Sequence, residues 1–274
     1  MLLSEGQADA TYQPPTVLEF GQTYYWRIDE VNAPPDSTIY RGDVWSFTVE
    51  PFAYPIENIV ATASAASDPG LGLENTINGS GLDGDLHSAD EEDMWLSSGL
   101  GVQPTWIQYE FDRVYKLYEM LVWNYNVQFE LVLGFGVKDV TVEYSENGED
   151  WTVLGDVEFA RAPAAAAYAH NTTVDFQGVA AQYVRLTVNS GYGVLGQYGL
   201  SEVRFLYVPA HPREPQPADG ATAVAVDAAL AWRVGRDAAV HNVYLDAVVD
   251  TPALADTVTA SSYTPADLQF GTTY

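Results

Sequence analysis

Apolar and polar residues alternate through the middle of the chain. Between residues 137 and 151, Val140, Val142 and Tyr144 alternate with Thr141 and Glu143. A period of two in β-branched and aromatic residues predicts a half-buried strand. The Ser-Glu-Asn-Gly tetrapeptide that follows supplies an Asn-Gly pair suited to positive φ, so a tight turn is expected there. A tryptophan three residues later begins a returning strand.

The same signal recurs along the chain, and helical periodicity is almost absent. Fifteen prolines and twenty-two glycines interrupt the apolar segments. The pattern predicts an all-β chain. Between residues 56 and 208 the expected strands are Thr105–Phe111, Leu117–Asn124, Val137–Tyr144, Trp151–Val153, Thr172–Phe176, Gln182–Val188 and Glu202–Val208.

The two ends of the chain are related in sequence. Thr11–Tyr24 aligns with Ser262–Tyr274 with one gap, and Tyr274 stands 250 residues after Tyr24. A repeat at a fixed period is the mark of a repeating array. We therefore expect the chain to stop within a domain, as a piece of a longer array.

Composition narrows the classes of partner. The chain has 274 residues, enough for two to three domains, and a formal charge of −27 from 38 acidic and 11 basic residues. Such a field repels nucleic acid and anionic lipid, so we expect neither as a partner. The sequence has no run of eighteen apolar residues, so no membrane span is predicted, and the first residues do not form a secretory signal. There is no cysteine, so neither disulfides nor thiolate metal sites are expected.

The terminal segments resemble parts of fibronectin type III-like β-sandwiches. Expected strands at 24–32 and 43–49 follow a Leu-x-x-Gly-x-x-Tyr approach that ends at Tyr24 and looks like a tyrosine corner. On this resemblance, residues 1–50 are the C-terminal part of one such domain. Residues 211–274, with expected strands at 229–232 and 241–245, are the N-terminal part of a second. The two halves can pair within one chain, stay apart, or pair between molecules, and the sequence leaves these alternatives open.

Residues 56–208 resemble the discoidin domains, that is, the coagulation factor five/eight type C group, which includes the carbohydrate-binding modules of family 32. The resemblance implies a galactose-binding-like jelly roll. Seven motifs carry it, in chain order: Ala-Thr-Ala-Ser at 61–64, Asn-Thr-Ile-Asn-Gly at 75–79, Met-Trp at 94–95, Trp-Ile-Gln-Tyr-Glu-Phe at 106–111, the hairpin Ser-Glu-Asn-Gly-Glu-Asp-Trp at 145–151, Gln-Tyr-Val-Arg-Leu at 182–186 and Leu-Ser-Glu-Val at 200–203.

Many members of this family hold a structural calcium ion. Carried over by motif, its ligands here are Asn75, Asn78, Asp93 and Glu202. Two positions depart from the family pattern, because Asn78 replaces an aspartate and Asp93 replaces a threonine. The exchange conserves the number of charges, and oxygen ligands of mixed type suit calcium. The alternative is an Asx turn at Asn78 and a solvated Glu202.

Sugar-binding relatives use loops at one end of the barrel, where an aromatic ring stacks on a pyranose and polar groups bind its hydroxyls. Three loops here combine such residues, at 85–88, 123–126 and 192–198. The alternative for Asn124 and Asn126 is that their side chains cap turns. The candidate ligand-binding residues are His87, Asn124, Asn126, Tyr192, Gln197 and Tyr198.

The chain shows no Gly-x-Ser-x-Gly, His-Glu-x-x-His or phosphate loop, so no enzymatic activity is expected. The resemblance implies a non-catalytic carbohydrate-binding module within a larger exported multidomain bacterial protein. Its partner would be a glycan or polysaccharide, and its location extracellular or at the cell surface. The alternatives are a protein–protein or cell-surface adhesion module, with other surface proteins as partners, and an accessory fragment of a glycoside hydrolase.

Overall fold

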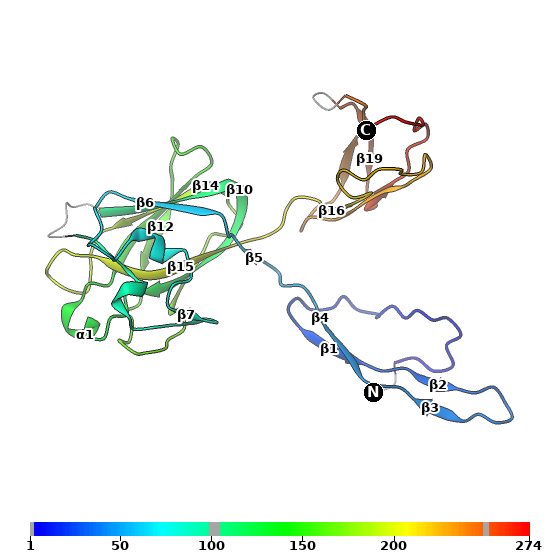
Figure 1. The fold of residues 1–274 in the computed structure, drawn as a ribbon, viewed down its shortest axis with the longest axis horizontal. Coiled ribbons are helices and arrows are strands. Elements are labelled where there is room, and N and C mark those ends of the chain that lie inside the picture. The colour runs from blue at the N-terminus through cyan, green and yellow to red at the C-terminus, as the bar shows by residue number, and fades with distance from the viewer. Residues whose placement is uncertain (1–2, 99–104, 249–251) are drawn as a thin grey trace. The chain divides into compact units, whose positions relative to one another are not determined.

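The structure is a computed structural model that describes residues 3–98, 105–248 and 252–274. The chain divides into two compact units, Met1–Phe52 and Ala53–Tyr274 (Figure 1). Strands dominate both, which confirms the all-β class. No helix in the described ranges is long and apolar enough to cross a membrane.

The first unit contains two ladders of two strands each. β1 pairs with β4, and β2 pairs with β3, both antiparallel. The strand expected at 24–32 is broken after Trp26, where the Arg27 guanidinium lies 2.7 Å from the Asp29 carboxylate. The four strands are β1 (Thr23–Trp26), β2 (Asp29–Val31), β3 (Ile39–Arg41) and β4 (Trp45–Thr48).

The second unit is organised around one long strand, β10 (Thr105–Asn124). Its first part pairs with β6 and β14, and its last part pairs with β13 and β15. The register shifts between Glu110 and Tyr115, so the strand bends there and passes from one sheet to the other. The two strands expected at 105–111 and 117–124 are therefore one bent strand.

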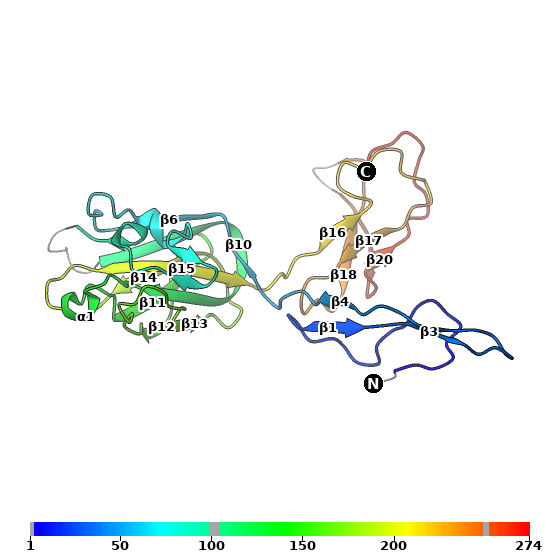
Figure 2. The same cartoon turned by 60° about the horizontal axis from the view of Figure 1, so that its bottom comes forward.

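The remaining strands complete a two-sheet jelly roll. β12, β11, β14, the first part of β10 and β6 form one sheet. β13, the last part of β10, β15, β9 and β5 form the other, and β10 connects the two. Figure 2 shows β10, β14 and β15 running along the long dimension of the jelly roll. The elements are β5 (Tyr54–Pro55), β6 (Ile59–Ala63), a 3₁₀ turn Leu73–Thr76, β7 (Leu82–Asp83), β8 (Leu86–His87), a 3₁₀ turn Glu91–Asp93, β9 (Trp95–Leu96), α1 (Glu130–Leu133), β11 (Asp139–Ser145), β12 (Thr152–Glu158), β13 (Thr172–Asp175), β14 (Ala180–Val188) and β15 (Gly199–Tyr207).

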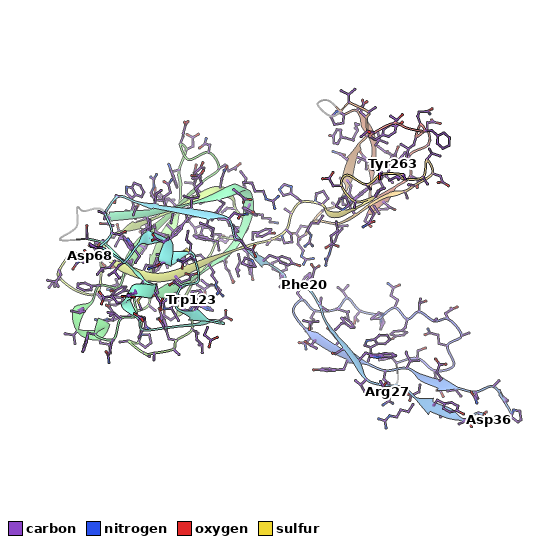
Figure 3. All side chains as sticks on the ribbon, in the orientation of Figure 1. Phe20, Arg27, Asp36, Asp68, Trp123 and Tyr263 are labelled. Atoms are coloured by element: carbon purple, nitrogen blue, oxygen red, sulfur yellow. The ribbon has the colours of Figure 1, made fainter. Side chains whose placement is uncertain are left out.

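The core lies between the two sheets and follows from the alternation in the sequence. Along the first part of β10, Ile107, Tyr109 and Phe111 are buried, and the residues between them are not. Phe205 of β15 packs against the rings of Tyr109 and Phe111, at 5.2 and 5.1 Å between centroids. Trp123 is also fully buried within the jelly roll (Figure 3).

The β11–β12 hairpin forms as the sequence predicts. The Ser145 hydroxyl accepts hydrogen bonds from the backbone N–H groups of Asn147 and Gly148, and Gly148 has φ +77°. The Trp151 indole N–H donates to the Gly148 carbonyl at 3.1 Å. The Arg185 guanidinium stacks 3.8 Å from the centre of the Trp151 ring, which fastens the hairpin to β14.

The residues after the jelly roll form two further small sheets. β17 lies between β16 and β20, and β18 pairs with β19. The strands expected at 229–232 and 241–245 correspond to β17 and β18. The five strands are β16 (Arg213–Gln216), β17 (Leu230–Arg233), β18 (His241–Tyr244), β19 (Leu254–Val258) and β20 (Ser262–Tyr263).

Candidate functional site

Three loops meet at the end of the jelly roll that carries α1. Both views place this end opposite β5 (Figures 1 and 2). The loops are 125–138, 159–171 and 189–198. Backbone hydrogen bonds connect the first and the third, since Tyr192 N donates to Gly136 O at 3.1 Å. The end is therefore a joined surface rather than three independent loops.

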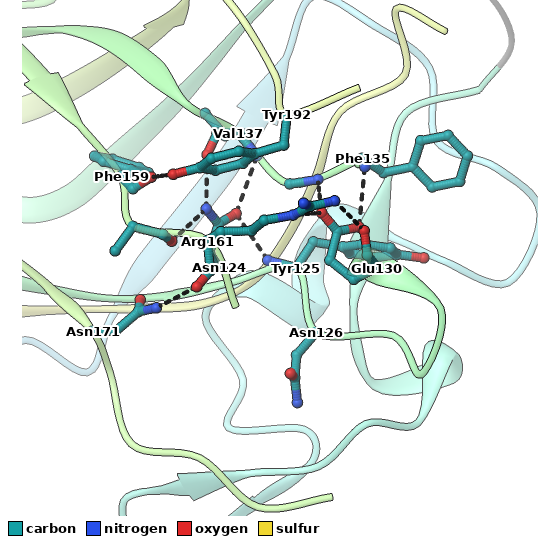
Figure 4. A network of polar contacts seen from close by, with 12 residues as sticks. Asn124, Tyr125, Asn126, Glu130, Phe135, Val137, Phe159, Arg161, Asn171 and Tyr192 are labelled. Carbon is teal, nitrogen blue, oxygen red and sulfur yellow. Dashed lines mark hydrogen bonds and ion pairs between the residues drawn. The ribbon is translucent and has the colours of Figure 1, made fainter. Parts of the chain in front are cut away.

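Asn124 holds this end together from inside. Its side chain is fully buried at the last position of β10. The amide nitrogen donates to Val137 O at 2.7 Å and to Ala160 O at 2.9 Å. The amide oxygen accepts from Tyr125 N at 2.9 Å and from Val137 N at 3.1 Å (Figure 4). All of the hydrogen-bonding capacity of this amide is used within the chain.

Asn126, two residues after Asn124, connects other loop segments in a similar way. It is fully buried, and its amide nitrogen donates to Ser88 O at 2.8 Å and to Ala165 O at 2.7 Å. The neighbouring His87 is also fully buried, with Nδ1 at 3.0 Å from Ser88 O. Burial lowers the pKa of His87, so the ring is neutral at pH 7. These side chains fix the loops and do not reach the surface.

A buried carboxylate lies beneath the third loop. Glu130 accepts hydrogen bonds from Phe135 N and Gly136 N, each at 3.0 Å, and its carboxylate lies 3.7 Å from Arg161 Nε. Burial raises the pKa of Glu130, and the two N–H groups and Arg161 oppose that rise. The Arg161 guanidinium faces the Tyr192 ring at 5.3 Å, and the Tyr192 hydroxyl donates to Phe159 O at 2.7 Å (Figure 4).

Besides these buried polar groups, the first and third loops expose Gln128, Asn189 and five apolar side chains. Phe129 is 62% exposed, Val132 83% and Val194 98%, and Leu131 and Leu195 are also exposed. We refer to these five residues as the apolar crest. Single exposed apolar residues are ordinary on protein surfaces, whereas a group of five on two joined loops indicates a contact surface.

Two glycines allow the two halves of the crest to approach. Gly134 ends α1 with φ +69°, in the left-handed region that favours glycine. A Cβ atom at Gly134 would lie 2.5 Å from the backbone nitrogen of Gly193. Only glycine fits at this crossing, so the close contact of the loops is encoded at these positions.

The remaining residues proposed from the sequence lie on or beneath the third loop. Tyr192 and Gln197 are half-buried, and Tyr198 is buried. The Gln197 amide donates to Ser97 O at 3.0 Å, and the Tyr198 backbone N–H donates to Ser97 Oγ at 2.9 Å. The structure thus gathers Asn124, Tyr192, Gln197 and Tyr198 at one end, and only Tyr192 and Gln197 offer partly accessible side chains.

The four residues proposed as calcium ligands surround one turn at residues 75–81. Asn78 donates to the Asn75 side-chain oxygen at 3.4 Å, and its own oxygen accepts from Ser80 N at 2.7 Å. Asp93 accepts from the Ser80 hydroxyl at 2.9 Å, and Glu202 accepts from Gly79 N at 3.2 Å. Asn78 therefore forms an Asx turn, and the Asp93 and Glu202 carboxylates each accept one hydrogen bond from it.

The chemistry of this turn fits a hard cation in part. Glu202 is buried, and burial raises its pKa to about 7, against which the Gly79 N–H and Arg204 act only weakly. A cation beside that carboxylate would offset the cost of its charge. In the ranges that the structure describes, no three His, Cys, Asp or Glu side chains group closely enough to hold a metal ion. Carboxamide and backbone oxygens would have to supply the other ligands.

Sequence reasoning missed the first half of the apolar crest. The signal was present as the run Phe129-Glu130-Leu131-Val132-Leu133, which lies between the end of β10 and a glycine. A short, mostly apolar run between a polar Asn-Tyr-Asn segment and a glycine indicates a single helical turn within a loop, too short to bury all of its apolar side chains. Val194 and Leu195 lay inside a loop that was singled out for its tyrosines.

Comparison with known proteins gives a family and a set of similar folds. The family model described as the F5/8 type C domain matches residues 60–201. The module CBM32-3 of a family 31 glycoside hydrolase from Clostridium perfringens is 21% identical, with a TM-score of 0.44, over 57% of this chain and 95% of that one. The family 32 carbohydrate-binding module of NanJ from Clostridium perfringens, in complex with galactose, is 15% identical, with a TM-score of 0.41, over 57% and 98%.

A fragment of a putative chitobiase from Bacteroides thetaiotaomicron is 17% identical, with a TM-score of 0.42, over 56% of this chain and 91% of that one. No curated protein sequence matches the chain. The family match covers more than half of the 274 residues and coincides with the jelly roll from β6 into β15. The chain belongs to the F5/8 type C domain family.

Proposed function

We propose that the jelly roll is a non-catalytic carbohydrate-binding module and that the apolar crest is its binding face. The observation that carries this proposal is the exposed Phe129 ring, which precedes Glu130, whose buried carboxylate is held by two backbone N–H groups. An aromatic ring stacks on the apolar face of a pyranose, and a rigid frame reduces the entropy lost on binding. Tyr192, Gln197 and Arg161 are partly exposed polar groups of the same three loops, and Arg161 contacts both Tyr192 and Glu130.

The charge of the chain favours an uncharged glycan. The net charge of −27 repels sialylated, sulfated or uronic acid polymers at low salt. At the crest, Glu130 is buried and engaged, and residues 190–198 contain no charged side chain. Discrimination among neutral sugars would then depend on how the hydroxyls meet Tyr192, Gln197 and the backbone of the loops.

A glycan array, followed by calorimetry with the best ligand, tests this function. Phe129→Ala should weaken binding about five- to thirtyfold, because a stacked ring contributes about 1–2 kcal/mol. Val60→Ala is the matched control, since Val60 is equally exposed on β6. If no neutral glycan binds, or if the two variants bind equally well, the crest is not a sugar-binding face.

A protein-binding adhesion module is the second candidate, and the aliphatic part of the crest favours it. Val132 and Val194 are almost fully exposed and offer a sugar no hydrogen bonds. An apolar group surrounded by polar residues is the composition of a protein contact. Val194→Ser separates the two, because it should abolish adhesion to a protein surface and leave stacking on Phe129 almost unchanged.

We further infer the setting of the module. The flanking segments would be parts of fibronectin type III-like sandwiches in an exported, extracellular bacterial protein, with residues 56–208 as the module. An accessory role beside a glycoside hydrolase fits the same arrangement. The non-catalytic part of the proposal is supported by the lack of recognised catalytic motifs in the sequence, and Glu130, the buried carboxylate at this end, is engaged by two N–H groups and Arg161.

We also propose that the turn at 75–81 holds a structural calcium ion with Asn75, Asn78, Asp93 and Glu202 as ligands. The support is the buried Glu202 carboxylate, whose pKa burial raises to about 7 although the Gly79 N–H and Arg204 oppose that rise. An ion that binds only the folded state raises the melting temperature. Equal melting curves in chelator and in excess calcium would refute this site.

A further inference from the structure

A small cavity lies at the β5 end of the jelly roll, beside the bend of β10. It has a volume of about 180 Å³, and Tyr207, which pairs with Tyr54 of β5, forms part of its wall. Of the described residues that line it, none is acidic, although acidic residues outnumber basic ones by 38 to 11 in the whole chain. The cavity is instead lined by three of these basic residues and one histidine, namely Arg113, Lys116, Arg213 and His211. It is therefore a local concentration of positive charge on an acidic protein.

Two of the arginines are held against a cluster of three tyrosine rings. The rings of Tyr115 and Tyr54 lie 4.6 and 6.3 Å from the ring of Tyr207, between centroids. The Arg113 guanidinium lies 4.9 Å from the centre of the Tyr115 ring. The Arg213 guanidinium lies 5.6 Å from the centre of the Tyr54 ring. Stacking on a ring orients a guanidinium and does not itself use its N–H donors. Both guanidiniums are therefore oriented in advance of any ligand.

The positive charges of the cavity are only partly balanced within the chain. Lys116 Nζ lies 2.9 Å from the Asp237 carboxylate, whose side chain is 72% exposed. An ion pair that is exposed in this way is weak, so Lys116 can exchange it for another anion. Asp112 precedes Arg113 and accepts the hydrogen bond of the Tyr115 hydroxyl at 2.8 Å. In the part of the chain that the structure describes, no carboxylate forms an ion pair with Arg113.

We propose that this cavity binds a single oxyanion group, that is, a carboxylate, sulfate or phosphate. Arginine presents a planar fork of N–H donors that matches two oxygens of such a group. Arg113 and Arg213 supply two of these forks, and Lys116 adds a third positive charge. One water occupies about 30 Å³ of liquid, so the cavity has room for one such group with several waters but not for a chain of sugars. The group belongs either to a free anion or to one acidic sugar of a glycan.

The site is distinct from the apolar crest and does not depend on the function proposed for the crest. The crest lies at the α1 end of the jelly roll, and the cavity lies at the β5 end (Figures 1 and 2). The net charge of −27 opposes the approach of any anion. At about 0.15 M salt, however, exposed charges farther away than about 8 Å are largely screened. At that ionic strength the basic side chains of the cavity, and not the net charge, govern binding.

Titration of the full chain with sodium sulfate, sodium phosphate and sodium glucuronate tests the proposal. Sodium chloride holds the ionic strength at about 0.15 M throughout. The nuclear magnetic resonance signals of the arginine Nε–H groups report the binding. We expect the signals of Arg113 and Arg213 to shift and to saturate with at least one of the three anions, at a dissociation constant of about 10 mM or tighter. Tighter binding of glucuronate than of both inorganic anions identifies an acidic sugar as the ligand, and equal or weaker binding identifies a free anion.

Two variants assign the effect to the cavity. Arg113→Gln and Arg213→Gln should each weaken binding at least about tenfold. Arg41→Gln is the matched control, because it removes the same charge from an exposed residue of β3, outside the cavity. It should leave the dissociation constant unchanged.

Thermal unfolding of each variant shows whether the jelly roll stays folded. Arg113 is exposed, so Arg113→Gln should unfold at the temperature of the wild type and should carry the test even if Arg213→Gln is unstable. The proposal is overturned if none of the three anions shifts the Arg113 signal to saturation. It is also overturned if Arg41→Gln weakens binding as much as Arg113→Gln, since the effect would then follow from net charge alone.

Discussion

Replacing Asn124 with alanine separates a structural role from a ligand-binding role at the crest. The side chain is fully buried and makes four hydrogen bonds to backbone groups of three segments. The change leaves Val137 O, Ala160 O, Tyr125 N and Val137 N without these partners. Each unpaired buried group costs about 1–3 kcal/mol, and water entering the vacated volume recovers part of this.

We therefore expect Asn124→Ala to lower the free energy of unfolding of the jelly roll by about 3–5 kcal/mol, a large fraction of the total stability of a domain. The assay is urea unfolding followed by circular dichroism, with amide hydrogen exchange as the local measurement. The amide protons of Tyr125 and Val137 should lose protection before the rest of the jelly roll.

Asn189→Ala is the matched control, because Asn189 is exposed and makes one side-chain hydrogen bond, to Thr141 at 2.9 Å. It should change stability by no more than about 0.5 kcal/mol. If Asn124→Ala costs less than about 1 kcal/mol and mainly weakens glycan binding, the amide serves the ligand and the structural argument is refuted.

Three further changes test other parts of the chain. In chelator, the free energy of unfolding should fall by about 3 kcal/mol as pH rises from 4.5 through 7, because burial raises the pKa of Glu202 to about 7 and the folded state resists its ionisation. Glu202→Gln should remove this dependence of urea unfolding on pH, and calcium should reduce it. A wild-type free energy of unfolding that does not change with pH contradicts the argument. Gly134→Ala should destabilise the jelly roll by about 2 kcal/mol or more, since its Cβ would meet Gly193 at positive φ, and an unchanged melting temperature would show that the loops separate freely. Tyr24→Phe removes the hydrogen bond from Glu19 N and should lower the hydrogen-exchange protection of the Glu19 amide about fivefold, at about 1 kcal/mol; unchanged protection would show that the tyrosine hydroxyl does not close this loop.

The strands were predictable because their signal is local. Alternation places Ile107, Tyr109 and Phe111 on one face whatever the rest of the chain does, and a turn such as Asn147-Gly148 forms from its own atoms. The bend of β10 was not visible in this way. Whether 105–111 and 117–124 are one strand or two depends on which partners β14 and β15 present on either side of the bend.

The sequence located the candidate residues to loops but not the direction in which their side chains point. Asparagines that follow a strand suit both a turn and a ligand, and only the positions of Val137, Ala160 and Ala165 decide that Asn124 and Asn126 face inward. Composition gives no such information, because hydrogen-bond partners distant in sequence determine the direction of a polar side chain.

The sequence by itself determined the all-β class, the order of most strands, the family motifs and the repeat that ends in Tyr24 and Tyr274. Each of these depends on neighbours in the chain or on a comparison of one segment with another. The tertiary structure decided which side chains are exposed. It buried Asn124 and left Phe129 and Val194 in solvent, because Gly134 and Gly193 bring two loops into contact across a long separation in sequence.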